Sequence, residues 1–328
     1  MQIQQVQFSR YKALRKIKAE TKNINVLTGR NNAGKSTFLS ALRLLEAAMT
    51  YAKRRSPSMV KTHLGRRHGY IVPTEQLPIS LDNVHTDLEE VDTTVDFLFE
   101  NDVILTLYFP VDAGCIFFVQ GMVAPKTPSS FKSHFPFQIV QVPVLGPLED
   151  EEPLVQDATL KRGLGTHRAS RHFRNYWYRN TESFQGFADL IARTWEGMEL
   201  EPPTMRTTLQ GTFLQMYCTE YRRYRELYWF GFGFQIWCQL LTHISRANPG
   251  DIIVVDEPET YLHPKVQKQL LGILRETGAQ VFMASHSATI IATAKPEEVM
   301  GIDREGNKEQ RYKEIGIALC QRLGLLPQ

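Results

Sequence analysis

Cysteine is scarce in this chain, and long apolar runs are absent. The four cysteines among the 328 residues are widely spaced and form no CxxC pair, which excludes a zinc ribbon and a disulfide framework. No run of 18 apolar residues exists, so we expect no membrane-spanning helix. The N-terminus lacks the apolar core of a signal peptide. We therefore expect a cytoplasmic protein with reduced thiols.

The excess of positive over negative charge is also small, because the formal net charge is only +3. This total does not by itself indicate a nucleic-acid partner. The basic residues are nevertheless clustered, because residues 51–74 and 158–174 contain lysines and arginines but no acidic residue. Such blocks usually lie on a solvated surface, although they leave open a contact with nucleic-acid phosphates.

Apolar periodicity predicts alternating strands and helices. We expect strands at 2–8, 24–28, 252–256 and 281–285, and helices at 36–52, 184–196, 230–247 and 264–276. Further strand candidates lie within 91–109, 115–123 and 137–144, where short connections predict antiparallel pairing. The strand–helix alternation near the C-terminus predicts a parallel sheet covered by helices.

Residues 29–36 match the phosphate-loop pattern GxxxxGK[ST], with a predicted strand before them and an amphipathic helix after them. The glycines let backbone N–H groups surround phosphate oxygens, and the helix N-terminus adds positive potential. We predict that Lys35 contacts the β- and γ-phosphates of ATP and that the Ser36 hydroxyl binds Mg²⁺. The expected nucleotide-binding residues of this loop are Gly29, Asn31, Asn32, Ala33, Gly34, Lys35, Ser36 and Thr37.

Two carboxylates follow the apolar strand at 252–256. Asp256 ends this strand and is the predicted partner of Ser36 in holding Mg²⁺. Glu257 comes next and is the predicted general base that orients the attacking water. His286 directly follows the strand at 281–285, where it can contact a γ-phosphate or the water. The predicted catalytic residues are therefore Glu257, His286 and Lys35.

These motifs together resemble a known family. The run DEPETYLHP at 256–264, followed by a strand and Ser285-His286-Ser287, resembles the ATP-binding-cassette (ABC) heads of the RecF, structural-maintenance-of-chromosomes (SMC) and overcoming-lysogenization-defect (OLD) groups. The phosphate loop GRNNAGKST looks most like that of OLD-type ATPases.

The resemblance implies an α/β P-loop NTPase fold of the ABC-head type. Its core sheet is expected to be mixed or parallel, with an antiparallel β subdomain and a helical inserted lobe. We expect residues 1–144 to form the first ATPase lobe, 145–230 an inserted, mainly helical subdomain, and 231–328 the rest of the ATPase lobe with the signature-like helix.

The resemblance also implies contacts outside the phosphate loop. Lys12 follows the first strand, where such heads carry a basic residue near the phosphates. Gln141 ends the strand candidate at 137–144 and is the predicted Q-loop glutamine that senses Mg²⁺ and water. Gln138 in the same strand is the alternative.

A further implied contact comes from the signature motif, which caps the γ-phosphate bound by the opposite subunit. The matching run is GFGFQ at 231–235, in which Gly231 and Gly233 are the candidate contacts. Phe232 replaces the signature serine, so binding there would use backbone amides. The resemblance therefore implies a head-to-head dimer that ATP holds together, with higher oligomers left open.

The function implied by the resemblance is an OLD-like ATPase that acts as a dimeric switch on a nuclease, in prokaryotic antiphage defence. The nuclease would be a TOPRIM or other type, separate or fused. We find no TOPRIM pattern of one glutamate and a later DxD, and Asp303 is isolated. The C-terminal run IGIALCQRLGLLPQ resembles the segment that precedes a TOPRIM domain in fused relatives.

Two other functions stay open at this point. A RecF-like ATPase of DNA repair or DNA sensing would use the basic runs and Arg222, Arg223 and Arg225 on phosphates, and the aromatic residues at 176–178 on bases. A transporter ATPase subunit is disfavoured by the altered signature and the large middle insertion.

Overall fold

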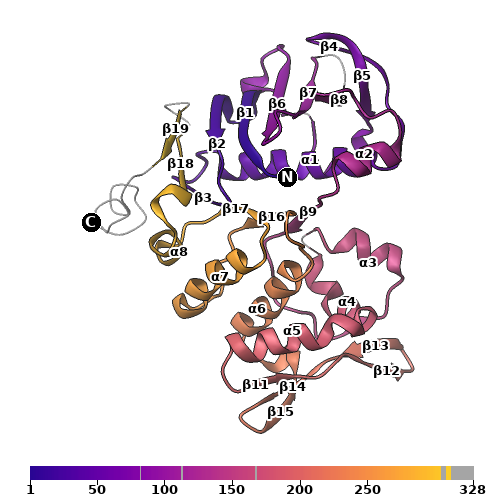
Figure 1. Ribbon diagram of the computed structural model, residues 1–328. Helices are drawn as coiled ribbons and strands as arrows, with labels where there is room; N and C mark the ends of the chain where they lie inside the picture. Colours follow the sequence, from indigo (N-terminus) through magenta and orange to yellow (C-terminus); the bar gives the residue numbers. More distant parts are fainter. Residues whose placement is uncertain (82, 112–113, 167, 304–307, 312–328) are drawn as a thin grey trace. The chain divides into compact units, whose positions relative to one another are not determined.

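The computed structural model describes residues 1–303, except 82, 112–113 and 167, and residues 308–311 (Figure 1). The chain forms two compact units. Unit 1 comprises residues 1–139, 249–254 and 278–328, and unit 2 comprises residues 140–248 and 255–277. The three-part division predicted from the sequence stays a prediction. The C-terminal segment that resembles the approach to a TOPRIM domain lies outside the described residues.

Unit 1 contains a seven-stranded antiparallel sheet in the order β2-β1-β6-β7-β8-β5-β4. The antiparallel pairing predicted for the strands within 91–123 is confirmed. Along β6 buried and half-buried residues alternate, because one face of the strand packs on the core. The strands are β1 Ile3–Tyr11, β2 Leu14–Glu20, β4 Ser58–Thr62, β5 Gly65–Val72, β6 Thr93–Phe99, β7 Ile104–Phe109 and β8 Cys115–Gln120.

A second sheet has six strands in the order β19-β18-β3-β17-β16-β9. β17 and β18 both pair with β3 in parallel, and β19 pairs with β18 antiparallel, so the predicted mixed core sheet is confirmed. All residues of β3, β16 and β17 are buried. The strands are β3 Ile24–Thr28, β9 Ile139–Val142, β16 Ile252–Asp256, β17 Gln280–Ala284, β18 Val299–Asp303 and β19 Lys308–Arg311.

The strand predicted at 137–144 exists as β9, but its grouping with the antiparallel β block is wrong. It is an edge strand of the six-stranded sheet. Gln138, just before β9, donates its N–H to the Asp251 carboxylate at 2.9 Å and accepts from the Ile252 N–H at 2.9 Å. These two bonds fix the start of β9 beside the start of β16.

Helix α1 (Lys35–Ala52) packs between β1 of the seven-stranded sheet and β17 of the six-stranded sheet (Figure 1). The Phe38 ring centroid lies 5.1 Å from that of Phe8 in β1 and 6.0 Å from that of Phe282 in β17. Phe38, Leu42, Leu45 and Met49 lie three to four residues apart and are buried, which confirms the predicted amphipathic helix. The other helices of unit 1 are α2 Pro128–His134, α8 Ala288–Thr293 and the short 3₁₀ turns Thr74–Gln76, Thr86–Leu88 and Pro296–Glu298.

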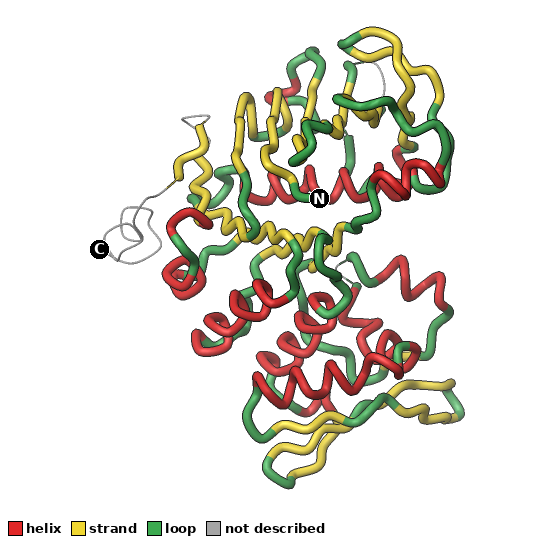
Figure 2. Tube along the Cα trace, in the orientation of Figure 1, coloured by secondary structure: helices red, strands yellow, loops and turns green. Residues whose placement is uncertain are grey.

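Unit 2 contains the inserted segment, and it is mixed in structure. Figure 2 shows helices in red, with hairpin strands in yellow after α5. The helices predicted at 184–196 and 230–247 are present as α5 and α6, whereas the six short strands were not predicted. The helices are α3 Asp157–Gly163, α4 Phe173–Arg179, α5 Thr181–Thr194, α6 Phe232–Ile244 and α7 Pro264–Glu276, with 3₁₀ turns at Ala169–His172 and Leu227–Trp229. The strands are β10 Glu152–Pro153, β11 Met198–Leu200, β12 Thr204–Thr208, β13 Gly211–Gln215, β14 Tyr217–Glu220 and β15 Arg223–Glu226.

Two buried tryptophans hold α6 against the helices of the inserted segment. Trp177 of α4 donates its indole N–H to Thr242 Oγ1 at 2.8 Å, and Trp237 of α6 donates to Thr194 Oγ1 at 3.0 Å. The Trp177 ring also stacks on Phe187 at 4.2 Å. None of the described helices is both long and apolar enough to cross a membrane. The three cysteines in the described part of the chain are buried and free.

Acid should destabilise unit 2 through His243, a buried residue in the last turn of α6. Burial and the nearby Arg246 guanidinium lower the pKa of His243 to about 3. In the unfolded chain a histidine has a pKa of about 6.5. Between these values only the unfolded chain binds the proton. The free energy of unfolding therefore decreases as the pH is lowered, by up to about 1.4 kcal/mol per pH unit.

Urea unfolding at pH values between about 7 and 5 checks this expectation. The free energy of unfolding of the His243→Gln variant should depend less steeply on pH than that of the wild type. The difference in slope should correspond to about one proton. Equal slopes would show that His243 is not the group responsible.

Candidate functional site

The loop at 29–36 follows β3 and needs glycine at two positions. Gly29 has a φ of 151° and Gly34 a φ of 112°, both in the region that favours glycine. A Cβ atom at Gly29 would lie 2.4 Å from the Ile302 carbonyl oxygen, and one at Gly34 would lie 2.6 Å from Leu14 Cδ2. The loop therefore forms a closed backbone turn into which no side chain fits at either glycine.

Lys35 lies inside this loop. Only 6% of the residue is exposed, and its Nζ donates to the carbonyl oxygens of Gly29 at 3.0 Å and Arg30 at 3.1 Å. No side chain caps α1, so the N–H groups of its first turn are available to an anion. The other predicted loop residues are placed as follows: Asn31, Asn32 and Ser36 are exposed, Thr37 is half-buried, and Ala33 is buried.

Thr28, the last residue of β3, was missed by the sequence analysis. Its hydroxyl is buried, and it has no hydrogen-bond partner among the described residues. A buried hydroxyl of this kind costs free energy unless a water or ligand satisfies it. A threonine that ends a buried strand directly before the loop was the available signal.

His286 lies at the same sheet edge as the loop. Ala284 of β17 is paired with Leu27 of β3, and Ser285 donates its N–H to the Leu27 carbonyl at 3.1 Å. The chain therefore leaves β17 beside the point where β3 passes into the loop. His286 is half-buried there.

The turn between β1 and β2 carries Lys12 and rests against the loop. Leu14, two residues after Lys12, is the side chain that closes over Gly34. Lys12 itself has a φ of 48° and donates its N–H to the Val84 carbonyl at 2.9 Å, which fixes the turn. Burial lowers the pKa of the Lys12 ammonium, because the charged form loses solvation.

The two carboxylates predicted at the end of β16 belong to unit 2. Asp256 is 9% exposed, whereas Glu257 is exposed and has a φ of 48°. The Thr260 hydroxyl donates to the Glu257 carbonyl at 3.0 Å and stabilises this conformation. Asp256 and Glu257 line a small cavity of about 10 Å³, which Ile236 and Leu240 of α6 also line.

Gln141 fits a ligand-sensing role better than Gln138 does. Both amide atoms of Gln141 are buried and have no hydrogen-bond partner in the described part of the chain. Gln138 is exposed. Since buried amides in proteins are nearly always hydrogen-bonded, the Gln141 side chain is suited to a water or ligand.

The glycine-rich run at 231–235 forms the start of α6. Gly231 precedes the helix, and no side chain caps it. A Cβ atom at Gly233 would lie 2.9 Å from the Tyr261 carbonyl oxygen, so the helix start packs closely on the segment after Glu257. Phe232, which replaces the signature serine, is 52% exposed and lies 6.1 Å from the Tyr261 ring.

These donor groups fit a magnesium–triphosphate. The buried ammonium of Lys35 and the uncapped start of α1 suit an anion. A serine hydroxyl and an aspartate carboxylate are hard oxygen ligands of the kind that Mg²⁺ prefers. Lys35 and His286 belong to unit 1, whereas Asp256, Glu257 and Gln141 belong to unit 2.

Comparison with known proteins identifies the class. A model described as "AAA ATPase domain" matches residues 1–190, more than half of the chain, and one described as "AAA domain, putative AbiEii toxin, Type IV TA system" matches residues 151–292. The comparison with curated proteins finds no match.

Solved structures share the fold at low sequence identity. An SMC head bound to the C-winged helix domain of ScpA has a TM-score of 0.59 and 13% identity, and the match covers 98% of this chain and 100% of that one. A Pyrococcus furiosus SMC head bound to the C-terminal domain of ScpA gives 0.54 and 11%, covering 98% of each chain. The Thermotoga maritima SMC head gives 0.50 and 13%, covering 92% of this chain and 94% of that one. The chain therefore belongs to the AAA ATPase domain family, and its fold is that of an SMC-like ABC ATPase head.

Proposed function

We propose that this ATPase binds ATP with Mg²⁺ at the loop 29–36 and hydrolyses it as a head-to-head dimer. The observation that carries the proposal is the loop itself. It combines two glycine positions that exclude side chains, a buried Lys35 ammonium and an uncapped helix start. The ammonium and the uncapped helix start favour a bound polyphosphate, and the glycines allow the tight backbone turn between β3 and α1.

The catalytic roles follow from the chemistry of the side chains. Lys35 and the backbone N–H groups of the loop bind the phosphates, and Ser36 and Asp256 hold Mg²⁺. Bound Mg²⁺ neutralises phosphate charge. Glu257 orients a water and accepts its proton, while His286 contacts the γ-phosphate. The strand order supports this assignment, because β17, which precedes His286, lies between β3 and β16 in one sheet.

Three further groups complete the proposed site. Lys12 lies in the turn that packs on Gly34, so it contacts the phosphates from the β1–β2 side. Gln141 supplies its amide to the Mg²⁺ and water. Gly231 and Gly233 bind, through backbone N–H groups, the γ-phosphate held by a second copy. Exposed aromatic residues beside them, Phe232 and Tyr261, support an interface at this point, because large exposed apolar groups mark contact sites.

The switch is proposed to control a nuclease in antiphage defence. This part rests on the motif resemblance to OLD-type ATPases, and the nuclease would be a separate subunit or a further domain. Co-purification of a nuclease with the native protein, and its activation or arrest by ATP, would support it. A purified complex whose nuclease activity is unaffected by ATP would contradict this proposal.

A RecF-like role in DNA repair or DNA sensing is the second candidate. The β14–β15 turn exposes Arg222 and Arg223 between Tyr221 and Tyr224, which are 67% and 56% exposed. Such a group of cations and rings suits phosphates and bases. Trp177, also predicted to stack on bases, is only 1% exposed and belongs to the core, so that expectation was wrong. Stimulation of ATP hydrolysis by DNA, lost in the Arg222→Ala/Arg223→Ala variant, would favour this candidate.

Replacing His286 by alanine should slow hydrolysis more than binding. A group that contacts the γ-phosphate during proton transfer contributes about 10²-fold or more to turnover. We therefore expect kcat to fall about 100-fold while the Kd for ATP–Mg²⁺ changes by less than about 3-fold. Phosphate release and calorimetry measure the two quantities. The matched control is His134→Ala, because His134 is exposed on α2. Equal losses of kcat and affinity would assign His286 a structural role instead.

A further inference from the structure

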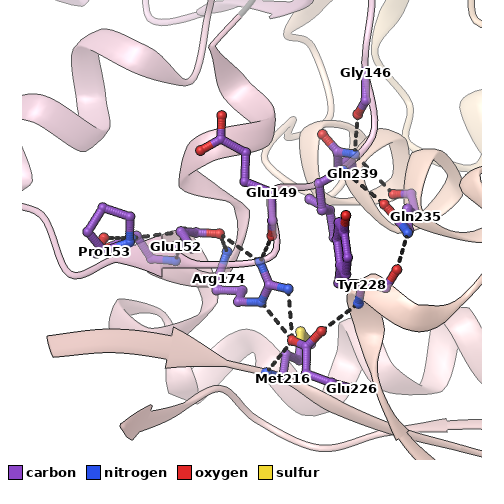
Figure 3. Close-up of polar contacts among 12 residues, drawn as sticks. Gly146, Glu149, Glu152, Pro153, Arg174, Met216, Glu226, Tyr228, Gln235 and Gln239 are labelled. Carbon is purple, nitrogen blue, oxygen red and sulfur yellow. Dashed lines mark hydrogen bonds and ion pairs between the residues drawn. The ribbon is translucent and has the colours of Figure 1, made fainter. Parts of the chain in front are cut away.

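Unit 2 contains a buried ionic network that the proposed catalytic roles leave unused (Figure 3). Its centre is Arg174, in the first turn of α4. The side chains of Arg174 and Glu152 are 0% exposed, and that of Glu226 is 10% exposed. Two carboxylates therefore share one guanidinium in the interior of the unit.

Every guanidinium nitrogen of Arg174 makes a contact. Nε and Nη2 donate to Glu226 Oε1 at 3.0 and 2.8 Å. Nη1 donates to the Glu149 carbonyl at 3.0 Å and lies 3.6 Å from Glu152 Oε2. Glu152 is further held by the N–H groups of Arg174 and Asn175, at 2.9 and 2.7 Å. The arginine thus joins α4 to the strand ends at β10 and β15.

The network continues from Glu226 to the start of α6. Glu226 Oε2 accepts from the Tyr228 N–H at 2.6 Å. The carbonyl oxygens of Tyr228 and Phe230 each accept from Gln235 Nε2 at 2.8 Å. Gln235 belongs to the first turn of α6 and is fully buried. The polar chain therefore runs from α4 to the glycine-rich start of α6.

The same turn of α6 also holds the segment that follows Gln141. Gln235 Oε1 accepts from the Leu148 N–H at 2.9 Å. One turn later, Gln239 Nε2 donates to the Gly146 carbonyl at 2.9 Å. Gln235 thus connects two parts of the proposed site, the Gln141 strand end and the chain around Gly231.

Apolar packing alone does not fix the backbone around Gly231. Phe230 packs on Phe234, but Trp229 and Phe232 on either side are 72% and 52% exposed. The orientation there depends on the bonds from Glu226 and Gln235. A buried group of ions is weak evidence of stabilisation, because apolar residues of the same volume often serve stability better. Its best supported role is to specify one arrangement.

We propose that Arg174 and Glu226 are positioning residues that hold the start of α6 in the orientation required for ATP hydrolysis. Through them the inserted helices control turnover without touching the nucleotide. The inference rests on the proposed function, in which Gly231 and Gly233 bind the γ-phosphate of a second copy.

The variant Glu226→Gln tests the inference with little change in shape. Glutamine has one acceptor oxygen, so it cannot accept from both Arg174 and the Tyr228 N–H. The NH₂ group of glutamine, itself a donor, then faces one of those donors, so no hydrogen bond forms between them. Because small misplacements of reacting groups cost up to about 100-fold, we expect kcat to fall about 10- to 100-fold. The Kd of the monomer for ATP–Mg²⁺ should stay within about 2-fold, because the phosphate loop is unchanged.

Arg174→Lys is the second variant. Lysine keeps the charge but loses the planar pair of N–H donors, so the same split between kcat and Kd is expected. In the double variant the two losses should not multiply, because both break one network. The matched control is Arg193→Met, which removes an exposed ion pair to Glu276 in the same unit, with both side chains 63% exposed. Its kcat should equal that of the wild type. Thermal unfolding verifies that each variant is folded.

The outcomes separate this inference from the proposed function. Absence of ATP hydrolysis by the wild-type protein would contradict the proposed function itself. An active wild type, together with a folded Glu226→Gln or Arg174→Lys variant of unchanged kcat, would overturn the positioning role alone. Equal losses of kcat and affinity would overturn it too, because they would indicate general damage to the fold.

Discussion

Replacing Lys35 by alanine is expected to weaken the binding of ATP–Mg²⁺ by about 100-fold or more. The side chain is nearly fully buried in its loop, and its ammonium is held by the carbonyl oxygens of Gly29 and Arg30. Hydrogen bonds to charged groups contribute roughly 1.5–3 kcal/mol each, and the proposed contacts involve two phosphates. Calorimetric titration of the purified variant with ATP–Mg²⁺ measures the effect.

Lys22→Ala is the matched control for this variant, because Lys22 is exposed and lies outside the loop. Its affinity should equal that of the wild type. Thermal unfolding would show that Lys35→Ala is still folded. A folded Lys35→Ala protein that binds ATP as tightly as the wild type would exclude this loop as the phosphate site.

Replacing Glu257 by glutamine should stall hydrolysis by roughly 10²- to 10³-fold and leave ATP bound. The amide has the shape of the carboxylate but cannot accept the proton of the attacking water. Glu257 is exposed and directly follows the buried Asp256, so the substitution leaves no buried group without a partner. Phosphate release measures the loss of turnover.

The same variant should also accumulate the proposed dimer, because ATP is no longer consumed. Light scattering should show twice the monomer mass with ATP–Mg²⁺ and the monomer mass without it. Glu276→Gln, at the exposed end of α7, is the matched control and should hydrolyse ATP normally. Wild-type turnover in Glu257→Gln would remove Glu257 from the mechanism, and a monomer with ATP bound would contradict the dimeric switch.

The parts of the fold that the sequence predicted are those with a strong local signal. β3, β16 and β17 are buried at every position, so they occur as short, mainly apolar runs. The loop at 29–36 is recognisable because its chemistry requires glycines at fixed spacing, as the tight contacts at Gly29 and Gly34 show. The first turn of the helix after it could be placed from the same motif.

Elements that depend on distant partners could not be predicted. Four of the five residues of β12 are exposed, so the strand lacks the apolar alternation that indicates a strand and forms through its pairing with β13. β9 was recognised as a strand, but Asp251, 113 residues from Gln138 along the chain, decides which sheet it joins. A strand's own residues do not encode its partner.

The buried network around Arg174 could not be predicted from local sequence either. Arg174 belongs to a run of basic residues that predicts a solvated surface, yet its side chain is fully buried. Its partners Glu152 and Glu226 are 22 and 52 residues away in the sequence, so no local pattern connects them. Conversely, the choice between Gln138 and Gln141 needed the structure, because only burial distinguishes their side chains.

A crystal structure of the Glu257→Gln variant grown with ATP–Mg²⁺ would show whether the phosphate loop and the end of β16 share one nucleotide. We expect one Mg²⁺ between the Ser36 hydroxyl and the Asp256 carboxylate, on a triphosphate whose β- and γ-oxygens contact Lys35. A triphosphate bound at Lys35 while Asp256 lies beyond the reach of its metal would exclude a shared site.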